Sequence, residues 1–137
     1  MFMQKITETF KVLSDESRLR ILMLLQEREL CVCQIMAVLN ISQPLISRNL
    51  SLLSRAGFLD ARREGKLMFY RKKKSLTKRN SLIISLLKEL SEGDKTLTKD
   101  IASLRDCEEF QKKSGKCGIE TLKAYMEHKK TRGGIHA

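Results

Sequence analysis

Four cysteines are the residues of this chain whose type and spacing could do chemistry. Cys31 and Cys33 are separated by one residue, and Cys107 and Cys117 lie further along with nine residues between them. Thiolates are strong ligands for thiophilic metals. The chain has no C-x-x-C pair, so neither a thioredoxin-type redox motif nor a zinc ribbon is predicted. The alternative for each cysteine is that it is a small buried apolar residue.

A second group of side chains suits nucleic-acid binding, because amide, hydroxyl and guanidinium groups form hydrogen bonds with base edges and phosphates. The candidates are Ser42, Gln43, Ser47, Arg48, Asn49, Ser51, Arg62, Arg63, Lys66 and Arg71. The charge distribution supports them: of a net charge of +11, residues 41–74 carry nine basic and two acidic side chains, whereas residues 1–40 are neutral overall. This concentration indicates a polyanion-binding surface, and the alternative is a solvated charged face.

Apolar periodicity predicts the elements that position these groups. Helices are predicted over residues 3–12, 15–28, 32–39, 43–55 and 76–91, and two strands over 58–62 and 67–71. Ser14 and Ser42 are predicted N-caps. In the fourth helix, Ile46, Leu50 and Leu53 form the inward stripe. A polar loop containing Gly65 joins the strands as a hairpin.

The predicted fold class is mainly α (α+β): a winged helix-turn-helix with a two-stranded wing and a C-terminal helical extension. We expect a DNA-binding and dimerisation domain over residues 1–91, a helical extension over 92–130 and a flexible tail over 131–137. The N-terminus does not resemble a signal peptide, and no apolar run approaches the roughly 18 residues of a membrane span. The sequence therefore predicts a cytoplasmic protein without a membrane partner.

Four segments, in order, resemble the ArsR family of bacterial metalloregulatory repressors. They are LSDESRLRILMLL (13–25), ELCVC (29–33), ISQPLISRNLSLLSRAGF (41–58) and REGKLMFYR (63–71), and the resemblance covers about residues 3–91. It implies a homodimer that represses an operon by occupying double-stranded operator DNA. It also implies dimerisation through the first and last core helices, here about 3–12 and 76–91.

Within this resemblance, ELCVC is similar to a motif in which thiolates capture trivalent arsenic or antimony. Cys31 and Cys33 correspond to the first two ligands, whereas the third cysteine of the arsenite pattern would fall at Met36. Two options follow: binding by two thiolates, or a third ligand from Cys107 or Cys117. Because residues two apart on an intact helix point about 200° away from each other, one atom bound to Cys31 and Cys33 would unwind the start of that helix.

The sequence also permits other interpretations. Cadmium and lead also bind thiolates, so they are alternative inducers. A redox- or sulfide-responsive thiol switch and an effector-independent DNA-binding protein are the alternative functions. The family's site of Asp and His pairs on the last core helix is not expected, because residues 76–91 contain neither. No loop typical of thiol enzymes is present, so the chain is not expected to be an enzyme.

Overall fold

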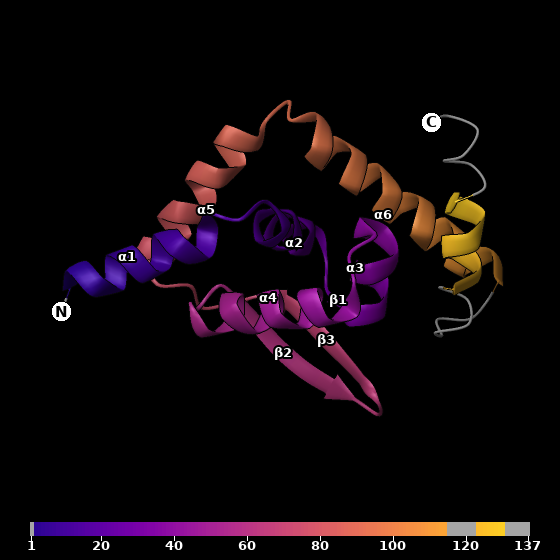
Figure 1. The fold of residues 1–137 in the computed structure, drawn as a ribbon, viewed down its shortest axis with the longest axis horizontal. Helices are drawn as coiled ribbons and strands as arrows, with labels where there is room; N and C mark the ends of the chain where they lie inside the picture. The colour runs from indigo at the N-terminus through magenta and orange to yellow at the C-terminus, as the bar shows by residue number, and fades with distance from the viewer. Residues whose placement is uncertain (1, 115–122, 131–137) are drawn as a thin grey trace.

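A computed structural model describes residues 2–114 and 123–130 of the chain. The described part is mainly helical with one small sheet (Figure 1). Its elements are α1 (Phe2–Leu13), α2 (Glu16–Glu27), β1 (Leu30–Cys31), α3 (Val32–Leu39), α4 (Gln43–Arg55), β2 (Leu59–Glu64), β3 (Leu67–Lys72), α5 (Lys78–Ser91) and α6 (Lys95–Ser114). Residues 123–130 are also helical. None of the described helices is both long and apolar enough to span a membrane.

The helix pair α3–α4 forms the predicted helix-turn-helix. Asn40 ends α3 in the left-handed conformation, with φ 60°, and its amide donates to the carbonyl of Met36. This conformation turns the chain sharply into α4, and asparagine tolerates it better than most residues. The predicted stripe of Ile46, Leu50 and Leu53 is fully buried against α2 and α3, so the inward face of α4 is confirmed.

The capping of α2 differs from the prediction by one residue. Asp15, not Ser14, is the N-cap, and its carboxylate accepts a hydrogen bond from the Arg18 amide. The Ser14 hydroxyl instead donates to the Phe10 carbonyl in the last turn of α1. The hydroxyl is therefore already used by the preceding helix. Ser42 does occupy the N-cap position of α4, but its side chain forms no capping hydrogen bond.

The sheet has three strands, in the order β1–β3–β2, and all pairs are antiparallel. The β2–β3 hairpin is the predicted wing, and Gly65 turns it with φ 62°. Strand β1 was not predicted, because a strand of two residues has no measurable periodicity. Its register pairs Cys31 with Phe69 of the wing.

Helix α6 packs along α2 and α3, while α5 and α6 meet at an apex above α2 (Figure 1). Leu104 and Cys107 of α6 belong to the same buried cluster as the core of the helix-turn-helix, and so does Tyr125. The helical extension expected over residues 92–130 therefore shares its core with the preceding residues. The predicted tail, 131–137, lies outside the described residues.

Candidate functional site

The cysteine pair lies where β1 becomes α3. Cys31 has an extended backbone at the N-cap and is buried, whereas Cys33 is half-buried in the first helical turn. The Cys31 amide donates to the side-chain oxygen of Gln34 at 2.9 Å. Only Cys33 is thus part of the helix, and Cys31 already has the extended backbone that two-thiolate binding would require of it.

The full set of four predicted ligands is not assembled in the described structure. Cys107 is buried on α6, and Cys117 lies outside the described residues. Among residues 2–114 and 123–130, no group of three or more Cys, His, Asp or Glu side chains could hold a metal ion. Cys31, Cys33 and Cys107 therefore do not form a three-ligand site here. Cys31 and Cys33 are the two cysteines that lie together, at the junction of β1 and α3.

The exposed side of α4, together with its N-cap, presents five of the ten predicted DNA-binding side chains to solvent. Ser42, Gln43, Ser47, Arg48 and Ser51 are all exposed. Leu45 is also exposed on this helix, although it was not among the predicted DNA-binding residues. Leu45 could have been selected from the sequence, because it lies outside the inward stripe of the helix. An apolar side chain at this position can contact the methyl group of thymine.

Asn49 does not belong to this surface, which corrects the prediction. Its side chain is 1% exposed, and its Oδ1 accepts a hydrogen bond from Arg18 Nη1 at 3.2 Å. Arg18 also donates to the carbonyls of Val12 and Lys11, so Asn49 helps to join α4 to the end of α1. An asparagine that is buried beside an arginine of α2 cannot reach a base edge in this conformation.

The wing carries exposed positive charge at Arg63 and Lys66, and Arg71 is half-buried. Arg62, in contrast, forms ion pairs with Glu29 at 2.6 Å and with Glu64 at 2.9 Å. Its guanidinium lies 4.6 Å from the ring centre of Phe69. These hydrogen bonds raise the pKa of Arg62 above its ordinary value and lower the pKa of Glu29. The charge of Arg62 is therefore partly neutralised within the protein.

The cysteine segment and the wing are directly connected. Cys31 is paired with Phe69 in the sheet, and Glu29, two residues before Cys31, binds Arg62. On its other side, Cys33 belongs to α3, which leads through Asn40 into α4. The cysteine segment is thus connected to the basic surface in two ways: to the wing through the sheet, and to α4 through α3.

A helix-turn-helix with an exposed polar face, followed by a basic hairpin, defines a winged helix-turn-helix protein. The model for the bacterial regulatory protein, arsR family, matches residues 15–61. The arsenical resistance operon repressor of Escherichia coli (strain K12) is 51% identical over 65 residues, covering 47% of this chain and 56% of the relative. An uncharacterised HTH-type transcriptional regulator of Methanocaldococcus jannaschii is 46% identical over 68 residues, covering 49% and 76%.

Among solved structures, the homodimeric winged helix-turn-helix domain of a possible ArsR-family regulator from Mycobacterium bovis is similar, with a TM-score of 0.56 and 26% identity. It covers 69% of this chain and 84% of that one. The chain belongs to the ArsR family of bacterial regulatory proteins. This membership agrees with the prediction that the chain is not an enzyme. The chain spans about half the length of the arsenic-resistance relatives that it matches.

Proposed function

We propose that this chain is a homodimeric transcriptional repressor that binds double-stranded operator DNA in the cytoplasm and releases it when arsenite or antimonite binds Cys31 and Cys33. The observation that carries the proposal is the position of the cysteine pair. It lies in the segment that is bonded to the wing through β1 and that continues into the helix-turn-helix. The relatives named for arsenical resistance support the choice of ligand.

The DNA surface that we propose combines the exposed side of α4 with the basic residues of the wing. Gln43 and Arg48 have the side-chain types that read base edges in the major groove, and Ser42, Ser47 and Ser51 suit phosphates or bases. Arg63, Lys66 and Arg71 suit the phosphates that flank the groove. Arg62 joins them only if its ion pairs with Glu29 and Glu64 open.

The dimer that we propose uses α1 and α5. Both helices carry large apolar side chains that the described chain does not cover: Phe10 on α1 is 58% exposed, and Leu82, Leu86 and Leu90 on α5 are 61%, 54% and 71% exposed. A second copy would bury them, because exposed apolar patches of this kind are typical of protein interfaces. Two-fold symmetry would then place two α4 helices about 34 Å apart on one face of the DNA.

Release follows from the change that ligand capture requires. Cys31 is extended and Cys33 is helical, so we expect both thiolates to reach one arsenic atom only when the first turn of α3 opens. Opening this turn disturbs the pairing with β3 and the support of α4. A coupling free energy of about 1–3 kcal/mol per site is the usual allosteric range.

The test is a titration of the protein on a labelled duplex that carries the promoter region of its own gene, followed by fluorescence anisotropy. Arsenite, antimonite, cadmium and zinc are added to the wild type and to Cys31→Ser, Cys33→Ser and Cys107→Ser. We expect arsenite and antimonite to release the wild type and Cys107→Ser, but not Cys31→Ser or Cys33→Ser. Normal release of Cys33→Ser by arsenite would contradict the proposal.

The same titration separates the alternatives. Release by cadmium but not by arsenite would identify a different thiophilic inducer. Release by mild oxidant, with a mass decrease of about two hydrogens for a new disulfide, would support the thiol-switch reading. DNA affinity that is unchanged by every thiophilic ligand and by oxidant would support an effector-independent DNA-binding protein. If Cys107→Ser binds DNA but is no longer released by arsenite, Cys107 is also a ligand.

A further inference from the structure

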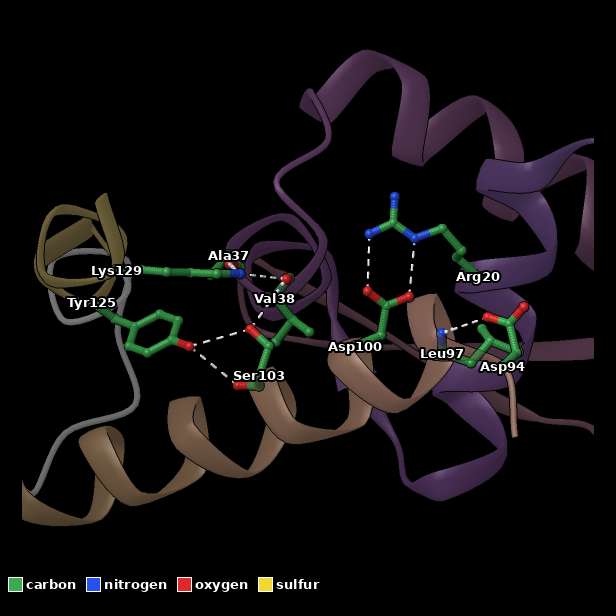
Figure 2. Close-up of polar contacts among 9 residues, drawn as sticks. All are labelled: Arg20, Ala37, Val38, Asp94, Leu97, Asp100, Ser103, Tyr125 and Lys129. Atoms are coloured by element: carbon green, nitrogen blue, oxygen red, sulfur yellow. Dashed lines mark hydrogen bonds and ion pairs between the residues drawn. The ribbon is translucent and has the colours of Figure 1, made fainter. Parts of the chain in front are cut away.

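The C-terminal segment contacts the last turn of α3, immediately before the turn that leads to α4. Lys129 Nζ donates to the carbonyl of Val38 at 2.6 Å and to that of Ala37 at 3.3 Å (Figure 2). The hydroxyl of Ser103, on α6, lies 3.3 Å from the same Val38 carbonyl. Two separate elements therefore converge on one carbonyl at the end of the first helix of the helix-turn-helix.

These contacts satisfy groups that a helix cannot satisfy by itself. The last four carbonyls of an α-helix have no partner within the helix, and they carry the negative end of its dipole. In α3, the Asn40 amide bonds to the Met36 carbonyl. Lys129 and Ser103 supply donors to the next two carbonyls, those of Ala37 and Val38. The cation is thus placed where the helix dipole favours it.

Lys129 is held in place by the packing around it. The neighbouring Tyr125 is fully buried, and its hydroxyl donates to the Ser103 carbonyl at 3.1 Å (Figure 2). Its ring also lies 5.6 Å from that of Phe110. Burial raises the pKa of Tyr125 to about 12 and lowers the pKa of Lys129. Asp100 of α6 is buried and binds Arg20 of α2 through two hydrogen bonds of 2.9 Å, which fixes α6 against the core.

At the other end of α3, α6 makes a second contact. Gln34 Nε2 donates to Gln111 Oε1 at 3.2 Å, while Gln34 Oε1 accepts from the Cys31 amide. The C-terminal residues therefore hold α3 at its start, beside the cysteine pair, and at its end, beside the turn into α4. Helix α3 packs against α4, so these two contacts lie at both ends of a helix that supports α4.

We propose that Lys129 is a positioning residue for the DNA-binding helix: by binding the Val38 and Ala37 carbonyls, it fixes the end of α3 and with it the orientation of α4. The proposal rests on the function proposed above, because α4 is the element that would enter the major groove. Helix α6 and residues 123–130 are then a clamp on the helix-turn-helix. In this proposal Lys129 affects DNA affinity through its contact with α3, and not by binding DNA itself.

The experiment compares Lys129→Met with Lys130→Met in the full chain. Both variants remove one positive charge at adjacent positions, but Lys130 is exposed and only Lys129 binds α3. Amide hydrogen exchange over residues 37–45 is measured first, in the protein without DNA or ligand. We expect faster exchange in Lys129→Met than in Lys130→Met, and restoration in Lys129→Arg, because arginine can donate to the same carbonyls.

DNA affinity on the promoter duplex is measured next. We expect Lys129→Met to bind about tenfold more weakly than Lys130→Met, within the range for a cation at a partly buried helix C-terminus. Equal exchange and equal affinity in the two variants would overturn the inference. If Lys129→Met does not fold, Lys129→Gln is compared with Lys130→Gln, and equal exchange over residues 37–45 in those two variants also overturns it.

The two proposals fail in different ways. A wild type that binds no DNA would refute the proposed function and, with it, the role of Lys129 in DNA affinity. A wild type that binds DNA, together with a Lys129→Met variant that matches Lys130→Met, would refute this inference alone.

Discussion

Gln43 and Asn49 lie on the same helix and have the same functional group, yet the structure gives them opposite surroundings. Gln43 is exposed at the start of α4, whereas Asn49 is buried and accepts a hydrogen bond from Arg18. Both amides could read adenine equally well by their chemistry. The difference is that Arg18 reaches Asn49 from α2, so one amide stabilises the fold and the other is available for DNA.

Substitution of the two amides should therefore have separable effects. We expect Asn49→Ala to lower the free energy of unfolding by about 1–2 kcal/mol, because Arg18 loses a buried acceptor, without changing the preferred DNA sequence. Gln43→Ala should change stability by less than about 0.5 kcal/mol but weaken binding to its preferred site by about 1–3 kcal/mol. Urea denaturation and anisotropy with base-substituted duplexes measure both. An altered base preference in a fully stable Asn49→Ala would contradict this assignment.

At the scale of the elements, the short strand β1 connects the cysteine segment with the wing. The backbone of β1 pairs Cys31 with Phe69 of β3, and the side chain of Glu29, just before β1, binds Arg62 of β2. Arg62 of β2 also stacks over Phe69 of β3, so this one side chain contacts both strands of the hairpin. The ion pair is exposed, and such pairs contribute little to global stability. Its effect should instead be seen in the charge that the wing offers to DNA.

Removal of the Glu29 carboxylate should leave Arg62 with only the exposed Glu64 as an ion-pair partner, which makes Arg62 more available to a phosphate. We expect Glu29→Gln to bind DNA more tightly and to steepen the slope of log affinity against log salt by roughly 0.9 for one added phosphate contact. Glu27→Gln, with the same charge change at an exposed position in α2, is the matched control. If both variants show the same slope, Arg62 gains no contact with DNA.

The same contact has a predicted pH dependence. The hydrogen bond from Arg62 lowers the pKa of Glu29 in the folded protein below its ordinary 4.5. The stabilisation is therefore fully present above pH 4.5 and is lost as the pH falls through the lower, folded-state value. We expect the wing amides of wild type, but not of Glu29→Gln, to gain hydrogen exchange across that acid range, after correction for the intrinsic exchange rate.

At the scale of the whole molecule, charge and apolar surface are on different elements. The positive charge is concentrated in α4 and the wing, whereas the exposed large apolar side chains are mainly on α1 and α5. Helix α1 extends away from the body in Figure 1 and packs mainly against α2. A chain with this distribution can bind a polyanion with one face and a second copy with another.

Disruption of the apolar face of α5 should therefore produce a monomer. We expect Leu86→Asp to reduce the mass measured by light scattering to that of one chain of 15.8 kDa and to weaken DNA binding, because two half-sites can no longer be held together. Ser85→Asp is the control, since Ser85 lines the groove between α5 and β3 instead of the apolar face. A dimeric Leu86→Asp would show that α5 is not the interface.

Much of the architecture follows from local patterns in the sequence. The buried stripe of α4 and the glycine-containing hairpin each depend on a few neighbouring residues, so periodicity and turn chemistry predicted them. The two-residue strand β1 is too short for such a signal. The N-cap of α2 was predicted at Ser14 but is Asp15, because both adjacent residues can cap a helix. The Ser14 hydroxyl instead bonds to the last turn of α1.

The sequence by itself determined the helix-turn-helix, the wing, their concentration of positive charge and the position of the cysteine pair before α3. Tertiary structure alone decided that Asn49 is buried, that Arg62 is paired with Glu29 and that Lys129 binds the end of α3. The last two contacts join residues 33 and 91 positions apart. Helical and strand periods are set by backbone geometry over a few residues, whereas contacts at such separations exist only after the elements have packed against one another.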